Sequence, residues 1–135
     1  MKLIDANVFI YAQGKDHPYR QPCRQLLDRI PQEKAAFQID AETVQELLFV
    51  YAARGLRQYG LDMAERVLEL FPELLPVDRP LIVEAKNLVA AYSFLLPRDA
   101  IHAAAVRLYG LEGIISADRV FERVTGVTRI DPKDA

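Results

Sequence analysis

The chain has 135 residues, 51% of them hydrophobic, and its 17 basic and 19 acidic side chains give a net charge of −2. This length allows one globular domain over residues 1–135 with a substantial core, and the charge excludes a strongly basic overall field. A single cysteine, Cys23, excludes a disulfide scaffold and a cysteine-based zinc site. No apolar run of about 18 residues and no cleavable leader pattern is present, so we expect a cytoplasmic protein.

Strand and helix patterns alternate along the chain. In order, they predict a strand at 2–4, helices at 8–12 and 18–30, a strand at 35–39, helices at about 41–55 and 61–71, a strand at 74–77, helices at about 78–94 and 97–110, a strand at 113–116, a short helix at 117–124 and a strand at 127–130. The second helix has apolar residues at i, i+3, i+4 and i+7 from Cys23 to Ile30. Strands that alternate with helices form parallel βαβ units. We therefore predict an α/β fold, a three-layer α/β/α sandwich around a mainly parallel sheet of about five strands.

Four carboxylates lie at places where ligand sites form in such a fold. Asp5 follows the first strand and Asp118 follows the fourth. Glu46 lies inside the helix after the second strand, and Asp99 begins an alanine-rich helix. Each is surrounded by apolar residues, where an unpaired charge is costly, and sites in open α/β sheets gather at the carboxyl ends of strands. We expect the four side chains to converge.

Converging carboxylates repel one another unless a cation joins them, so a divalent ion is their natural partner. The ligands are all oxygen, which suits Mg²⁺ or Mn²⁺ and disfavours zinc. Such ions orient water for attack on phosphorus and neutralise phosphate oxygens. The residues therefore indicate phosphodiester hydrolysis.

Each carboxylate also has a purely structural interpretation. Asp5, Asp99 and Asp118 suit the first turn of a helix, where short acidic side chains cap free N–H groups and the helix dipole favours negative charge. Glu42 competes with Glu46, because the two lie one turn apart on the same helix face. We favour Glu46, which has apolar neighbours and lies a full turn inside the helix.

Four motifs occur in order along nearly the whole chain: Asp5-x-Asn7 after the opening strand, Glu46 in VQELL, Asp99 in RDAIHAA and Asp118 in ISADRVF. Together they resemble the motifs of the PIN (PilT N-terminal) domain family, and they are most similar to those of its VapC-type ribonuclease toxins. The resemblance implies a parallel-sheet sandwich, an acidic pocket that binds Mg²⁺ or Mn²⁺, and metal-dependent cleavage of RNA. It also implies the toxin of a type II toxin–antitoxin pair, with a small antitoxin as partner. A homodimer agrees with the prevalence of two-fold homo-oligomers.

The resemblance also assigns roles to individual residues. The catalytic and metal-binding pocket is Asp5, Glu46, Asp99 and Asp118. Asn7 and Ser116 are its polar supports, and Ser116 keeps the hydroxyl of the family's usual threonine. Val120 stands where the family often has a further acidic residue, so a first metal position is better supported than a second.

Three further residues adjoin the expected pocket. His102 lies three positions after Asp99 on the same helix, and we favour packing or support of a carboxylate over direct metal binding. Arg98 and Arg119 each neighbour a pocket aspartate. We predict that these arginines balance its charge or contact RNA phosphates.

Two other functions stay open. A haloacid-dehalogenase-like phosphohydrolase also carries an aspartate after its first strand, but it needs a second one two positions later, where this chain has Asn7. A non-catalytic RNA-binding or protein-binding PIN-like domain fits the same residues, because an acidic pocket does not by itself prove turnover. We rank the ribonuclease first and the phosphohydrolase last.

Overall fold

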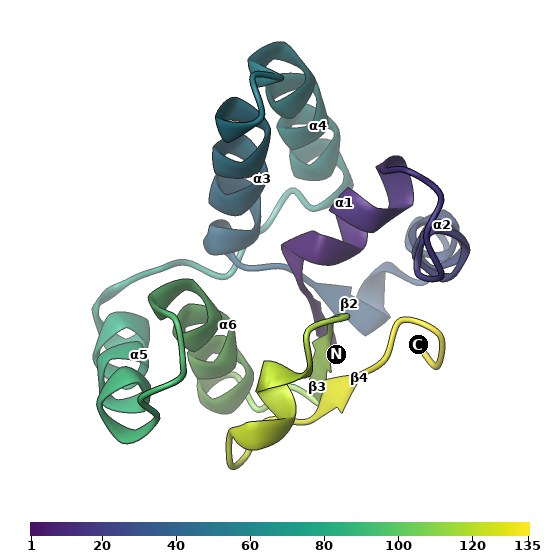
Figure 1. Ribbon diagram of the computed structural model, residues 1–135. Coiled ribbons are helices and arrows are strands. Elements are labelled where there is room, and N and C mark those ends of the chain that lie inside the picture. The colour runs from purple at the N-terminus through teal and green to yellow at the C-terminus, as the bar shows by residue number, and fades with distance from the viewer.

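The computed structural model describes residues 1–135 and contains one parallel sheet with the strand order β2-β1-β3-β4 (Figure 1). The strands are β1 (Lys2–Ile4), β2 (Phe37–Gln38), β3 (Gly113–Ile115) and β4 (Arg129–Ile130). The helices are α1 (Ala6–Gln13), α2 (Arg20–Arg29), α3 (Ala41–Ala53), α4 (Arg57–Leu70), α5 (Arg79–Ala91) and α6 (Pro97–Leu108), with 3-10 helices η1 (Lys34–Ala36) and η2 (Arg119–Arg123). None of the helices combines the length and the apolar character needed to cross a bilayer.

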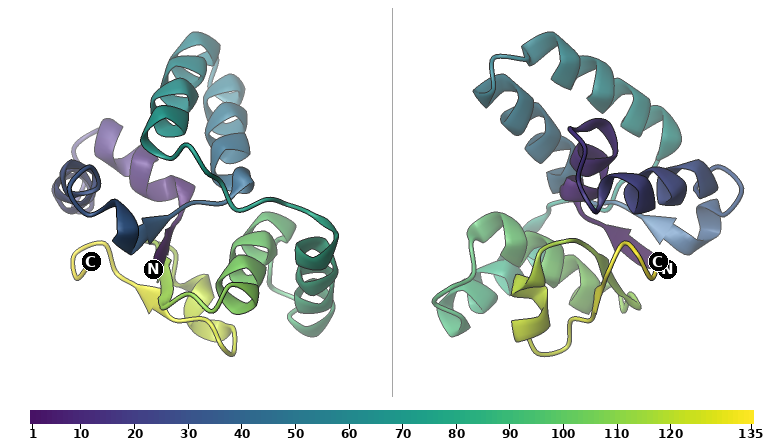
Figure 2. Two further views of the ribbon diagram at one scale, coloured as in Figure 1. Left: turned by 180° about the vertical axis from the view of Figure 1, so that it is seen from behind. Right: turned by 45° about the vertical axis from the view of Figure 1, so that its right-hand side comes forward.

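Helices cover both faces of the sheet. Side chains alternate between the faces of a strand, so Leu3 and Ile114 enter one apolar cluster while Ile4 and Ile115 enter the other. The first cluster is completed by α5 and α6, and the second by α1 to α4. Figure 2 shows the α3–α4 pair and the α5–α6 pair on different sides of the strands. The predicted three-layer α/β/α sandwich with a parallel sheet is confirmed.

The sheet has four strands rather than about five, because the strand predicted at 74–77 does not form. These residues make one isolated parallel bridge, between Asp40 and Leu75. Pro76 lacks the N–H that a strand ladder requires, and Pro72 and Pro80 bracket the segment. Apolar character alone was therefore a misleading signal here.

Candidate active site

An acidic pocket lies at the carboxyl ends of the central strands. β1 and β3 are parallel neighbours with Ile4 opposite Ile115, so the residues that follow them meet at one edge of the sheet. α3 and α6 pack together beside this edge and add Glu46 and Asp99. The pocket has a volume of about 130 Å³. It is lined by Asp5, Asn7, Ile10, Glu46, Val50, Arg98, Asp99 and Asp118.

Asp5 occupies the N-cap position of α1, yet its side chain makes no capping hydrogen bond. Its Oδ2 instead accepts hydrogen bonds from the Ser116 hydroxyl at 2.7 Å and from the Asn7 amide at 3.2 Å. The Asn7 amide also donates to Ser116 Oγ at 3.0 Å. The interpretation that the Asp5 side chain caps the helix is therefore wrong. The structure places Asn7 and Ser116 against this carboxylate, where they orient it.

Three of the four carboxylates are buried. Asp5 is 5% exposed, and Glu46 and Asp99 are each 8% exposed. Burial raises the pKa of Asp99 to about 6, and the Asp5 and Asp118 charges add to this rise. Burial also raises the pKa of Asp5, although His102 opposes the shift. The folded chain thus holds negative charges close together at an electrostatic cost.

Asp118 differs from the other three because it is exposed at the rim. It is the N-cap of η2, and its Oδ1 accepts from the Val120 N–H at 2.9 Å. Asp118 therefore caps η2 and lines the pocket at the same time. On α3, Glu46 lines the pocket, whereas Glu42 is half-buried and does not.

A buried Asp40–His102 pair lies behind the pocket. His102 Nδ1 donates to Asp40 Oδ2 at 2.7 Å, and both side chains are 0% exposed. The other ring nitrogen, Nε2, lies 3.7 Å from Asp5 Oδ1 and 3.6 Å from Glu46 Oε2. Burial alone lowers the pKa of the imidazole, but Asp40, Glu46 and Asp5 outweigh it and raise the pKa well above the usual value.

Sequence reasoning assigned no site role to Asp40. Asp40 is the N-cap of α3, since its Oδ1 accepts from the Thr43 N–H at 3.0 Å. The available signal was His102, because a histidine within an alanine-rich, buried helix needs a polar partner. That partner is Asp40, 62 positions away in the chain.

The two arginines predicted beside the pocket differ in position. Arg98 lines it, with Nε 3.4 Å from Glu46 Oε1, and its side chain is half-exposed. Arg119 does not line the pocket and lies 3.6 Å from Glu122. Only Arg98 is placed to act on the buried carboxylates directly.

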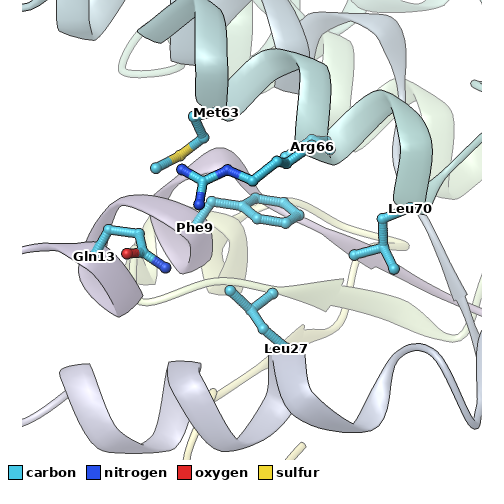
Figure 3. Close-up of a pocket in the computed structure, with 7 residues that line it drawn as sticks. Phe9, Gln13, Leu27, Met63, Arg66 and Leu70 are labelled. Carbon is cyan, nitrogen blue, oxygen red and sulfur yellow. The ribbon is translucent and has the colours of Figure 1, made fainter. Parts of the chain in front are cut away.

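A second cavity, also of about 130 Å³, lies between α1, α2 and α4 and is mainly apolar (Figure 3). Phe9 lies at its centre, between Leu27 of α2 and Arg66 of α4. No carboxylate lines it. It is therefore separate from the acidic pocket.

The sequence model of the PIN domain matches residues 2–127. The chain belongs to the PIN domain family. Relatives of this PIN domain include Ribonuclease VapC23 of Mycobacterium tuberculosis, which is 34% identical over 118 residues covering 87% of this chain and 93% of VapC23. Ribonuclease VapC13 of the same organism is 28% identical over 130 residues, covering 96% and 99% of the two chains.

Solved structures have the same fold. One chain in the crystal structure of FitAcB from Neisseria gonorrhoeae matches this PIN domain with a TM-score of 0.74 at 20% identity, over 98% of each chain. A chain of VapBC2 from Rickettsia felis, bound to a DNA fragment from its promoter, matches with a TM-score of 0.73 at 12% identity, over 96% and 98%.

Proposed function

We propose that this PIN domain is a divalent-metal-dependent endoribonuclease that hydrolyses RNA phosphodiester bonds. The observation that carries the proposal is the convergence of Asp5, Glu46, Asp99 and Asp118, from four separate segments, in one pocket. Relatives that match nearly the whole chain are named ribonucleases, which supports the same conclusion.

The donors of the pocket fit Mg²⁺ or Mn²⁺. One carboxylate oxygen of Asp5 and one of Glu46 lie within 4.8 Å of each other. Carboxylate oxygens are the ligands that these small, hard cations prefer. When bound, the ion supplies the positive charge that offsets the repulsion, and it activates water for attack on phosphorus.

Other residues of the chain orient this machinery and contact the substrate. Ser116 and Asn7 hold Oδ2 of Asp5, which sets the direction of the carboxylate. The half-exposed guanidinium of Arg98 lies at the pocket and can bind a phosphate through its planar pair of N–H donors. Arg119, which is exposed and follows Asp118 in the chain, provides a second guanidinium for contacts with RNA phosphates.

The test is cleavage of a mixed RNA pool by the purified protein with Mg²⁺ or Mn²⁺ and with EDTA. We expect metal-dependent cleavage that falls about a hundredfold or more in Asp5→Asn and Asp99→Asn, because each loses a charged ligand. Asp62→Asn is the matched control, since it removes an exposed carboxylate of α4 outside the pocket. RNA binding without cleavage in either metal would favour the non-catalytic alternative. Cleavage that survives both substitutions would place the activity elsewhere.

We further propose that the protein is the toxin of a type II pair, inhibited by a small antitoxin, and that it forms a homodimer. The fold match to a chain of a toxin–antitoxin complex from Klebsiella pneumoniae, with a TM-score of 0.68 at 19% identity over 100% of both chains, supports this proposal. Light scattering should give twice the 15.3 kDa mass of one chain.

Expression of the chain alone should stop growth, and co-expression of the antitoxin should restore it. Normal growth with wild-type chain alone would argue for RNA processing instead.

A further inference from the structure

Nε2 of His102 is a buried polar atom without a hydrogen-bond partner. A buried polar atom without a partner destabilises the fold, so its presence in a native site calls for an explanation. The nearest acceptors, on Asp5 and Glu46, are 3.7 and 3.6 Å away, which is too far for a hydrogen bond. The atom faces the same two carboxylates that line the pocket.

The opposite side of the ring is firmly held. Nδ1 donates to Asp40, and Asp40 in turn accepts from the N–H and the hydroxyl of Thr43. The Thr43 hydroxyl also donates to the Ile4 carbonyl, in the residue before Asp5. A carboxylate that orients a histidine through one ring nitrogen, leaving the other free for a metal, is a recurring arrangement in metalloproteins.

We propose that His102 Nε2 releases its proton to solvent and binds the divalent ion directly, together with Asp5 and Glu46, and that Asp40 is the positioning residue that holds the ring. This inference rests on the metal-dependent function proposed above. It replaces the oxygen-only ligand set and the supporting role of His102 that the sequence indicated. Imidazole nitrogen binds Mn²⁺ more strongly than it binds Mg²⁺, so this ligand should raise the affinity for Mn²⁺ relative to that for Mg²⁺.

The decisive measurement is pulsed electron paramagnetic resonance on the Mn²⁺-loaded wild-type protein. We expect echo modulation from one directly bound ¹⁴N nucleus, replaced by the ¹⁵N pattern when the protein is labelled with [¹⁵N]histidine. Because the wild-type chain is used, the result does not depend on a variant that folds. The chain has two histidines, and His17→Gln is the matched control, since His17 lies in the exposed loop after α1. It should keep the histidine signal.

Calorimetric titration of Mn²⁺ and Mg²⁺ gives a second readout. His102→Gln should weaken Mn²⁺ binding about tenfold or more and reduce the preference for Mn²⁺ over Mg²⁺. Asp40→Asn should weaken Mn²⁺ binding by about 10–100-fold, the usual effect of losing a partner behind a ligand. Mn²⁺ bound to wild type without a histidine signal would overturn the ligand assignment and leave the metal-dependent nuclease standing. No Mn²⁺ binding at all would overturn both.

Discussion

At the residue scale, one side chain supports several others at the end of β3. The buried Ser116 hydroxyl donates to Asp5 Oδ2 and accepts from the Asn7 amide and from the Asp118 N–H at 3.0 Å. Two pocket aspartates are thus connected through a single oxygen. Ser116 therefore orients the Asp5 carboxylate and positions the backbone at the start of η2.

Two substitutions at Ser116 distinguish the role of the hydroxyl from that of the rest of the side chain. Ser116→Ala leaves Asp5 and Asn7 without this partner, and we expect a loss of about 1–3 kcal/mol in unfolding free energy and at least a tenfold loss of RNA cleavage. Ser116→Thr keeps the hydroxyl and should retain most of both. Equal activity of the alanine and threonine variants would show that this network does not orient the site. Urea denaturation and RNA cleavage measure the two effects.

Asp99 gives a pH dependence with a definite sign. Its pKa rises from 3.8 to about 6 on folding, so the fold disfavours the ionised carboxylate. In EDTA, its ionisation should therefore lower wild-type stability as the pH rises from about 4 to 6, with the full penalty present above pH 6. Asp99→Asn should be more stable than wild type by up to about 3 kcal/mol at pH 8. The difference should vanish near pH 4.

Urea denaturation of the two proteins across this pH range measures the difference, with Asp62→Asn as the control for loss of an exposed carboxylate. A wild-type protein as stable as Asp99→Asn at pH 8 would contradict the penalty assigned to burial of the Asp99 charge near Asp5 and Asp118.

At the scale of elements, the strands of the sheet are very short, and the segment before β4 lies close against β3. The Ile114 N–H donates to the Thr128 carbonyl at 2.9 Å, next to the pairing of β3 with β4. A methyl group on Gly113 would overlap that carbonyl oxygen. Gly113 therefore permits the contact that positions the end of β3, three residues before Ser116.

Gly113→Ala should therefore push the Thr128 carbonyl away from β3. The overlapping atom belongs to the backbone and cannot rotate away, so we expect a loss of about 1–3 kcal/mol in unfolding free energy. Amide exchange at Ile114 should accelerate more than exchange in the α3–α4 pair, which provides a local control. An unchanged stability together with unchanged Ile114 exchange would show that the two segments move apart without cost.

At the scale of the whole molecule, the acidic pocket joins the two apolar layers of the fold. Glu46 belongs to the α1–α4 side and Asp99 to the α5–α6 side, so both layers contribute to one site. An ion that binds only when these layers are assembled must stabilise the fold by linkage.

Mn²⁺ or Mg²⁺ at about 100 times its dissociation constant should therefore add about 2.7 kcal/mol to the unfolding free energy. In a thermal melt at pH 8 this corresponds to an increase in Tm of several degrees. Asp5→Asn should lose the increase and Asp62→Asn should keep it. The same increase in all three proteins would mean that the ion binds outside the pocket.

Local sequence patterns were enough to predict the three layers and to select the four carboxylates that line one pocket. Alternation of short apolar strands with helices is a local pattern, and residues such as Asp5 and Asp118 follow strands whose ends meet in any parallel sheet. The same kind of local pattern wrongly predicted a strand at residues 74–77, because apolar residues between prolines resemble a strand without forming one. It also assigned Asp5 to helix capping as an alternative, since the capping preference does not reveal Ser116.

Packing between the layers selects the distant groups that meet behind the pocket. Asp40 and His102 are 62 positions apart, and their contact depends on how α3 packs against α6. The direction of Nε2 toward Asp5 and Glu46 depends on the same packing. Hydrophobic periodicity records which face of a helix is buried, but not which polar group it meets there. That choice follows from the packing of the layers, whose contacts no local pattern specifies.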